Sequence, residues 1–245
     1  MKYLFIFAHP DDETVACAGT IRQLVDQGDE VALTSVTPGE AGEVQPSALK
    51  KLRQAGSVSK LRQAELNKVA KALGIHQVTV LAFQDGTITN QLVWGKLQQD
   101  LIDQIDRLLP DVIITFDHTG WYFHLDHVGV SIAVTLAFHK TKHRPLALLH
   151  SHFQPGGKKW KYIFHASPAT HRVLVRDTHQ KLATMELHQS QDLQIPKAYV
   201  IKKKRHYEFF ELACATKKGK KLFSRSPIFS QIKKWVEAWG WFRYD

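Results

Sequence analysis

Two short strings of polar residues, more than a hundred positions apart, carry the side chains best suited to chemistry. Residues 9–13 read HPDDE and residues 124–127 read HLDH. Together they offer enough imidazole nitrogens and carboxylate oxygens for the three protein ligands of a catalytic zinc ion. A further carboxylate remains to act as a base. A catalytic zinc keeps one position for water and lowers the pKa of that water to about 7. The pairing therefore predicts a hydrolytic zinc site.

The first string lies between a predicted strand and a predicted helix. Residues 2–8 are mostly apolar, aromatic or β-branched, and a helical pattern with one apolar face begins near Thr14. His9 should therefore stand at the carboxyl end of a strand. Pro10 allows the chain to turn, so the three acids that follow are expected in the first helical turn.

The second string also follows a predicted strand. Residues 111–117 have the composition of a buried parallel strand, and His124 and His127 are three positions apart. Both imidazoles can face the same side if a helix begins near Phe123. Open α/β sheets place their ligand crevice at the carboxyl ends of such strands, so we expect the two strings to meet there.

Each string also has a purely structural interpretation. Pro-Asp-Asp-Glu is a favourable helix N-terminus, because proline suits the first turn and acids suit the positive end of the helix dipole. The joint occurrence of both strings, each at the end of a predicted strand, favours the metal site over this interpretation.

The order of motifs along the chain resembles the PIG-L/LmbE-like family of zinc-dependent N-acetylglucosaminyl deacetylases. The family pattern of AHPDDE, GE, RxxEL, LGI, DG and HxDH stands here at residues 8–13, 39–40, 62–66, 73–75, 85–86 and 124–127. A further family-like string, HQSQ, occupies residues 188–191. The resemblance covers residues 1 to about 212, and only the two metal strings are highly specific.

The resemblance implies a role for each residue of the two strings. The three zinc ligands, for one ion per chain, correspond to His9, Asp12 and His127. Asp11 corresponds to the base that takes the proton of the attacking water. Adjacent residues of a helix diverge by about 100°, so one aspartate should bind metal and the other face water, although spacing alone does not choose between them.

The resemblance also implies the reaction, which is removal of acetate from an N-acetylglucosamine-containing substrate. His124 corresponds to a residue that stabilises the oxyanion or protonates the leaving amine, and Asp126 to one that orients a histidine. An acetamide is a poor electrophile with a poor leaving group, so a Lewis acid, a base and an oxyanion donor are the aids it needs.

Three residues match family positions that hold the sugar, namely Arg62, Asp85 and Tyr122. Each also has a structural alternative. Arg62 could pair with Glu65 one helical turn away, Asp85 with its following glycine could form only a turn, and Tyr122 could serve only in packing.

The predicted elements give an α/β fold. Strand-like runs at 2–8, 30–37, 77–83, 111–117, 146–152 and 172–176 alternate with helical patterns at 14–27, 59–73, 96–109 and 126–140. This alternation predicts a three-layer, Rossmann-like domain with a mostly parallel sheet covered by helices on both faces. Residues 37–59 and 154–170 lack strong periodicity and are expected to form the walls of the site.

The positive charge is concentrated in the C-terminal segment. The chain carries a net charge of +10, and residues 201–245 hold twelve Lys or Arg against four Asp or Glu. We expect a deacetylase domain at 1–212 and a basic, aromatic-rich helical extension at 213–245. The extension suits peripheral contact with an anionic membrane or an acidic partner, or it packs on its own domain with the lysines in solvent.

Several features bear on the cellular setting. Two cysteines in 245 residues support no disulfide framework, and neither a signal peptide nor an apolar run long enough to cross a membrane is evident. These features predict a cytoplasmic protein that acts on a small N-acetylated sugar. Homo-oligomers are common in the family, but the sequence does not set the oligomeric state. The remaining histidines without a partner at ligand spacing, interpreted as surface or satisfied core residues, include His139, His143, His150, His152, His165 and His171.

Other functions were weighed against this prediction. A nucleic-acid-binding protein would explain the pI of about 9.5, but no binding motif is present and the charge lies in one segment. A substrate-binding pseudoenzyme would not need the base and all three ligands. The remaining alternative is a zinc amidase that acts on a thiol-glycoside conjugate or another amide. The sequence leaves open the aglycone and whether zinc or another divalent metal is bound.

Overall fold

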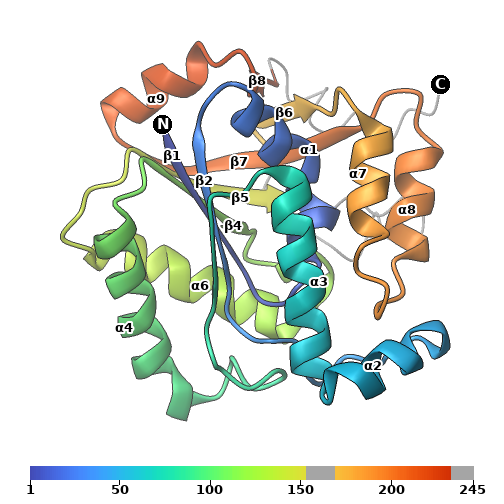
Figure 1. Ribbon diagram of the computed structural model, residues 1–245. Helices are drawn as coiled ribbons and strands as arrows, with labels where there is room; N and C mark the ends of the chain where they lie inside the picture. Colours follow the sequence, from blue (N-terminus) through green and yellow to red (C-terminus); the bar gives the residue numbers. More distant parts are fainter. Residues whose placement is uncertain (153–168, 233–245) are drawn as a thin grey trace.

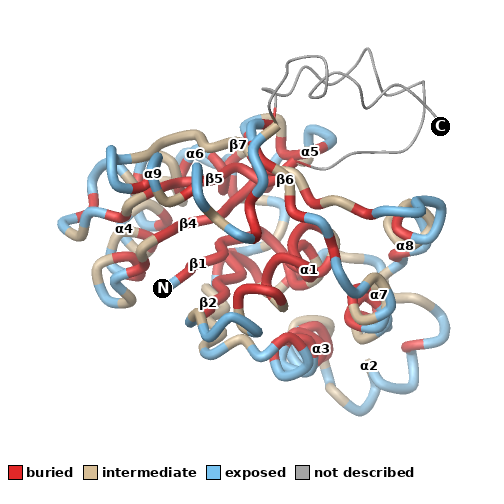
Figure 2. The backbone as a smooth tube through the Cα atoms, turned by 90° about the horizontal axis from the view of Figure 1, so that it is seen from above, coloured by how far each residue is buried: buried red, intermediate tan, exposed pale blue. Residues whose placement is uncertain are grey.

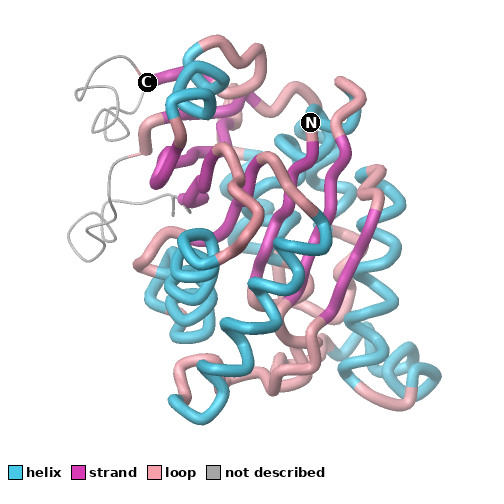
Figure 3. Tube along the Cα trace, turned by 90° about the vertical axis from the view of Figure 1, so that its left-hand side faces the viewer, coloured by secondary structure: helices cyan, strands magenta, loops and turns pink. Residues whose placement is uncertain are grey.

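A mixed β-sheet runs through the molecule, with helices against both faces (Figures 1 and 3). The computed structural model describes residues 1–152 and 169–232. Within these residues the sheet has the order β3-β2-β1-β4-β5-β7-β6-β8. Its strands are β1 (Lys2–Phe7), β2 (Glu30–Ser35), β3 (Gln77–Val80), β4 (Val112–Phe116), β5 (Ala147–His152), β6 (His171–Leu174), β7 (Tyr207–Ala215) and β8 (Ser230–Gln231).

The half of the sheet that carries the two polar strings is parallel. β1 pairs with β2 on one side and with β4 on the other, and β3 and β5 extend the parallel order outwards. The chain thus leaves β1 toward one side and returns to β4 on the other, which creates a topological switch point at the carboxyl ends of these strands. The predicted α/β fold with helices on both faces is confirmed.

The helices divide between the two faces. One face is covered by α1, α3 and α7, which contact one another, and the other by α4 and α6. The helices are α1 (Asp12–Asp26), α2 (Leu49–Ala55), α3 (Val58–Leu73), α4 (Gln91–Leu108), α5 (Gly120–Phe123), α6 (Leu125–Lys140), α7 (Thr178–Met185), α8 (Gln194–Ile201) and α9 (Lys217–Ser224), with a short 3₁₀ turn at Pro46–Ala48. Helix α4 begins five residues earlier than the sequence suggested, because the Asn90 side chain caps it by accepting a bond from the Leu92 N–H.

Helix α1, which carries the first string, is buried along most of its length (Figure 2). Small residues make this possible. A Cβ at Gly19 would lie 2.7 Å from a methyl group of Val175, so only glycine fits the close approach. Burial on nearly every side fixes the helix, and with it the direction of its first turn.

A buried ion pair fastens α1 to the C-terminal half of the chain. Lys181 Nζ lies 2.6 Å from Glu208 Oε1 and also donates to the carbonyl oxygens of Thr14 and Val15. The Glu208 carboxylate accepts bonds from the Gly19 N–H and from the N–H and hydroxyl of Thr20. Because every polar group of the pair has a partner, the charges are tolerated inside the protein.

The C-terminal part of the described chain is built onto the same sheet. β7 was not among the strands expected from the sequence, because its two glutamates interrupt the apolar pattern. In the folded protein one of them, Glu208, is neutralised by the ion pair with Lys181. The boundary expected between a domain and an extension, after residue 212, falls inside β7. Beyond it, β8 also joins this sheet by pairing with β6. Phe229 packs against Phe210 and Phe223. Trp235, Trp239 and Trp241, expected in the basic extension, lie outside the described residues.

No helix in residues 1–152 or 169–232 has both the length and the apolar character needed to span a bilayer.

Candidate active site

The two polar strings meet where the topology predicts. His9 directly follows β1, and α1 begins at Asp12. His124 is the N-cap residue of α6, and His127 lies in the first turn of that helix. The histidines face one another, with the centres of the His124 and His127 rings 4.5 Å apart and those of His9 and His127 5.3 Å apart.

Three side chains place donor atoms around one point. His9 Nδ1 lies 3.3 Å from His127 Nε2, His127 Nε2 lies 3.3 Å from Asp12 Oδ1, and His9 Nδ1 lies 3.6 Å from Asp12 Oδ2. A tetrahedral metal that binds nitrogen and oxygen at about 2.0–2.1 Å keeps its ligands about 3.4 Å apart. The spacing therefore fits a metal ion held by these three residues.

The outer nitrogen of His9 is held by two carboxylates. His9 Nε2 lies 2.9 Å from Asp85 Oδ1 and 3.4 Å from Asp126 Oδ2. Asp126 in turn accepts backbone bonds from Gly86 and Ile88. A proton on Nε2 satisfies these carboxylates and leaves the Nδ1 lone pair directed at the donor cluster, which is the usual arrangement of a metal-binding histidine.

The protonation of Asp12 and His127 suits a cation, whereas His9 would have to lose a proton to bind one: burial would lower the pKa of His9, but hydrogen bonds to Asp12, Asp126 and Asp85 raise it. Burial alone would raise the pKa of Asp12, but His127 and His9 lower it to about 2, so the carboxylate is ionised. Burial lowers the pKa of His127 to about 4, which keeps its imidazole neutral near pH 7. An anionic carboxylate and a neutral imidazole are the forms that bind metal.

His124 stands beside this cluster. One nitrogen each of His9, His124 and His127 lie within 4.8 Å of one another, so His124 is a second candidate for the third ligand position. Burial, and then the charge on His9, lower the pKa of His124. Asp12 Oδ1 lies 3.3 Å from His127 Nε2, the separation expected of two ligands of one tetrahedral ion, so the set of His9, Asp12 and His127 also fits a metal.

Asp11 is separated from Asp12 by its backbone conformation. We expected it in the first helical turn, but it is the N-cap residue, with φ of 135° and ψ of −26°. A positive φ is rare for a residue with a side chain, so the surrounding contacts must hold Asp11 in place. Burial raises the pKa of Asp11 to about 6 against the opposing charge of Arg62.

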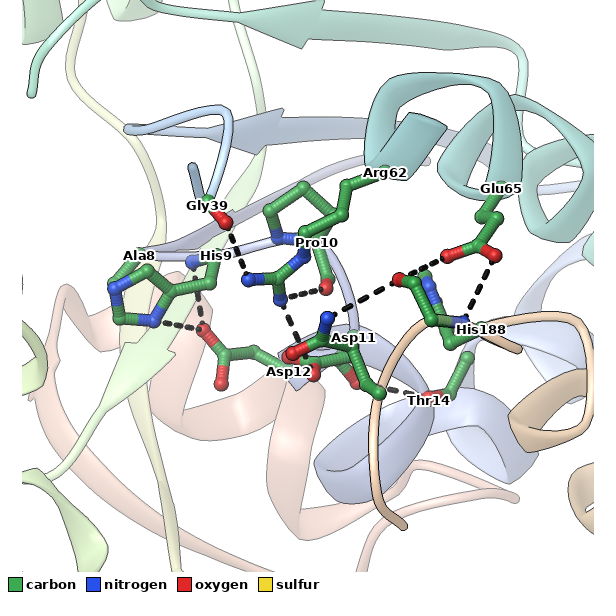
Figure 4. A network of polar contacts seen from close by, with 12 residues as sticks. Ala8, His9, Pro10, Asp11, Asp12, Thr14, Gly39, Arg62, Glu65 and His188 are labelled. Atoms are coloured by element: carbon green, nitrogen blue, oxygen red, sulfur yellow. Dashed lines mark hydrogen bonds and ion pairs between the residues drawn. The ribbon is translucent and has the colours of Figure 1, made fainter. Parts of the chain in front are cut away.

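Arg62 forms hydrogen bonds to the loop before α1 (Figure 4). Its guanidinium donates to the carbonyl oxygens of Gly39 and Pro10, both at 2.7 Å, and its Nη2 lies 3.3 Å from Asp11 Oδ2. Glycine is required at position 39 for two reasons. A Cβ there would overlap the Arg62 guanidinium, and the φ of +71° is unfavourable for a residue with a side chain. The alternative pairing of Arg62 with Glu65 is not formed, because Glu65 accepts bonds from the backbone and hydroxyl of Ser190.

The other two predicted sugar contacts differ in their surroundings. Asp85 is held by His9 and by the Ala41 N–H, and its own N–H donates to Glu40. Tyr122 is 45% exposed, and its ring centre lies 5.5 Å from that of His127. Burial of the hydroxyl region raises the pKa of Tyr122, so the phenol stays protonated. Of the three residues, Tyr122 has the most open position.

Two residues of the site were given no role by the sequence. Glu13 and His188 are both buried and lie behind Asp11, with Glu13 Oε1 2.7 Å from His188 Nε2. Each belongs to a motif already noted, the acidic string and the HQSQ string, but the two are 175 positions apart. Only the family-like pattern at 188–191 could have drawn attention to His188.

Comparison with known sequences places this site within a described family. The sequence profile of the PIG-L family, described as GlcNAc-PI de-N-acetylase, matches residues 4–138. A 1D-myo-inositol 2-acetamido-2-deoxy-alpha-D-glucopyranoside deacetylase from Thermobifida fusca is 31% identical over 154 residues, which are 56% of this chain and 54% of the relative. The chain thus spans about half the length of this relative.

Solved structures share the fold at lower sequence identity. The N,N'-diacetylchitobiose deacetylase from Pyrococcus horikoshii superposes with a TM-score of 0.66 at 19% identity, covering 86% of this chain and 82% of that one. The 4-carboxy-2-hydroxymuconate hydratase GalB from Pseudomonas putida superposes with a TM-score of 0.64 at 17% identity, covering 88% and 98%. At these identities the likeness establishes the fold alone, and the fold carries more than one chemistry.

Proposed function

Because the chain belongs to the PIG-L family, we propose that it is a metal-dependent hydrolase that removes acetate from an N-acetylglucosamine-containing substrate. The observation that carries the proposal is the convergence of His9, Asp12 and His127, whose donor atoms lie 3.3 to 3.6 Å apart beside the Asp11 carboxylate. The related deacetylases named above act on acetamido sugars, which supports the same class of substrate here.

We assign the metal to His9, Asp12 and His127, with zinc as the ion, because two imidazoles and one carboxylate are a common catalytic zinc set. A bound zinc would supply a Lewis acid and lower the pKa of a water molecule. Asp85 and Asp126 hold the outer nitrogen of His9 and so fix its orientation. This assignment gives Asp126 the orienting role that the family resemblance implies.

Asp11 is the proposed general base. Its carboxylate is half-buried beside Asp12 but turned away from it by the positive φ, so it can accept a proton from the attacking water. A pKa of about 6 suits this task, because a base works best when its pKa lies near the working pH. The leaving amine needs a proton, and Asp11 can return the one it accepted.

His124 and Tyr122 are the proposed partners of the acetamide oxygen. His124 is neutral near pH 7, and a neutral imidazole still offers an N–H to a developing oxyanion. The phenol of Tyr122 stays protonated and offers a second donor. Arg62 and Asp85, expected as sugar contacts, have polar contacts that support roles in holding Asp11 and His9 instead.

A second candidate function is an amidase whose product is not a simple amino sugar, such as one acting on a thiol-glycoside conjugate. The chain covers only about half of the inositol-glycoside deacetylase named above, so the part of that relative outside the match does not fix the aglycone here. Cytoplasmic location, membrane contact through the basic segment and homo-oligomer formation stay predictions.

The test is acetate release by the purified protein from a panel of N-acetylglucosamine derivatives. The panel should include N-acetylglucosamine itself, N,N'-diacetylchitobiose, an inositol glycoside and a thiol glycoside, and acetamides that carry no sugar should be assayed beside it. Release should disappear after treatment with a chelator and return with zinc. The Asp11→Asn protein, purified in parallel, controls for a contaminating deacetylase.

The pattern of release separates the candidates. Metal-dependent release from one class identifies the aglycone. Release only from amides that lack the sugar would replace the proposal with the amidase. No release from any amide with metal bound would refute both.

A further inference from the structure

Asp11, the proposed base, has an unusual backbone conformation that other residues must maintain. Its φ of 135° is unfavourable for a side-chain-bearing residue, and such strain persists only where contacts impose it. The peptide group that joins Pro10 to Asp11 is the part of the backbone whose rotation would relieve the strain.

This peptide group is held at both of its polar atoms. Its carbonyl oxygen, on Pro10, accepts a bond of 2.7 Å from Arg62 Nη2. Its N–H, on Asp11, donates to Glu13 Oε2 at 3.0 Å. Because a peptide group is planar, fixing both ends fixes its rotation and therefore the direction in which the Asp11 side chain leaves the backbone.

The Glu13 carboxylate is itself held from behind. Its other oxygen lies 2.7 Å from His188 Nε2, and both side chains are fully buried. Without His188, the Glu13 side chain would keep only its bond to the Asp11 N–H and could turn about its own side-chain torsions. His188 therefore decides which way the carboxylate faces.

His188 comes from a loop that is anchored independently of Glu13. The loop follows α7, and its Ser190 donates from backbone and hydroxyl to Glu65 on α3. The anchored loop thus presents His188 to Glu13, and Glu13 in turn accepts the bond from the Asp11 N–H.

We propose that Glu13 and His188 are positioning residues, which hold the peptide between residues 10 and 11 so that the Asp11 carboxylate faces the reacting water. The inference rests on the proposed function for its kinetic consequence. The positioning itself is a statement about backbone geometry and can be tested without activity.

A matched pair of amide substitutions tests the contact. The amide nitrogen of His188→Gln can occupy the place of Nε2 and reach Glu13, whereas the amide of His188→Asn is one methylene shorter and falls short of it. We expect His188→Asn to lower kcat by about 10- to 100-fold, because small displacements of a catalytic group have effects of this size. KM and bound metal should stay the same, and His188→Gln should stay within about threefold of the wild type.

Ser190→Ala is the control. It removes the hydroxyl bond to Glu65 but keeps the backbone N–H bond that anchors the loop, and it touches neither Glu13 nor Asp11. It should change the melting temperature about as much as His188→Asn and leave kcat unchanged. Equal kcat values for His188→Asn and the wild type would overturn the proposal, as would an equal loss in Ser190→Ala.

Crystal structures of His188→Asn and His188→Gln separate this inference from the proposed function. Asp11 should leave the positive-φ region in the Asn variant and keep it in the Gln variant. If the wild-type protein releases no acetate, the proposed function fails, and these two structures still decide the positioning. An Asp11 backbone that is identical in both variants would overturn it.

Discussion

Two groups of histidines and carboxylates lie at the carboxyl ends of neighbouring strands, and they are built differently. In the proposed metal cluster of His9, Asp12 and His127, the two imidazole nitrogens lie 3.3 Å apart, and each lies 3.3 to 3.6 Å from an oxygen of the Asp12 carboxylate. The second histidine cluster consists of His118, His150 and His152 with Asp117 and Glu211. None of its histidine–carboxylate contacts is shorter than 3.6 Å: His152 Nδ1 lies 3.6 Å from Asp117 Oδ2, and Glu211 Oε2 lies 3.6 Å from His150 Nδ1 and 4.0 Å from His152 Nε2.

The difference comes from the elements that supply the side chains. The metal cluster draws its members from the end of one strand and the first turns of two helices, so they converge end-on. His150 and His152 are two positions apart on β5 and point to the same face, which spreads them along the strand. Within residues 1–152 and 169–232, donor atoms of three side chains gather within 4.8 Å of one another in two groups, His9 with His124 and His127 and His9 with Asp85 and Asp126, and neither group belongs to this second cluster. Residue type alone therefore does not make a metal site.

The largest expected effect separates the two clusters directly. His127→Ala should no longer bind one zinc per chain. Its kcat should fall at least about a thousandfold, because a catalytic zinc polarises the substrate and activates water. His152→Ala should keep one zinc per chain. Metal analysis of both proteins after dialysis, with acetate release, makes the measurement. If His127→Ala kept its zinc and His152→Ala lost it, the metal site would lie in the second histidine cluster and our assignment would be wrong.

Asp11→Asn should separate the base from the metal within the first cluster. Turnover should fall by about 10²- to 10⁴-fold, the usual contribution of a general base, while zinc stays bound. The asparagine keeps the shape of the side chain and the contact with Arg62 through its oxygen. Near-normal kcat in this variant with full metal content would show that another residue is the base.

Tyr122→Phe tests the open side of the metal cluster. The substitution removes one hydroxyl donor and leaves the ring beside His127, so kcat should fall by about tenfold to a hundredfold with bound zinc unchanged. The parallel variant Phe123→Leu, on the neighbouring residue, should leave kcat within about threefold. A loss confined to KM in Tyr122→Phe would reassign the hydroxyl to ground-state binding.

The second cluster should show itself in the pH dependence of stability. Burial lowers the pKa of His152, so the imidazole is neutral in the folded protein, whereas the unfolded chain takes up a proton below about pH 6.5. The unfolded state then binds more protons, and stability falls as the pH drops from about 7 toward 5. Urea midpoints at pH 7.5 and pH 5 should differ less in His152→Gln than in the wild type. An unchanged difference would assign the acid sensitivity to other groups.

Sequence patterns predicted the parallel half of the sheet well, because its central strands β1 and β4 are nearly continuous apolar runs and each has a helix after it. They missed β7, whose glutamates look unfavourable until Glu208 meets Lys181 from α7. They also placed Asp11 inside the helix. Its N-cap position depends on Arg62 and Glu13, which meet the backbone only after folding.

The sequence by itself determined which side chains are available for the proposed chemistry and which strand ends hold them, since residue type and hydrophobic period are local properties. Only the tertiary structure decided that Asp12 joins the two histidines while Asp11 turns away, and that Glu13 and His188 stand behind it. Those outcomes depend on contacts between residues up to 175 positions apart. Such contacts are set by how the helices pack on the sheet, and no local pattern encodes them.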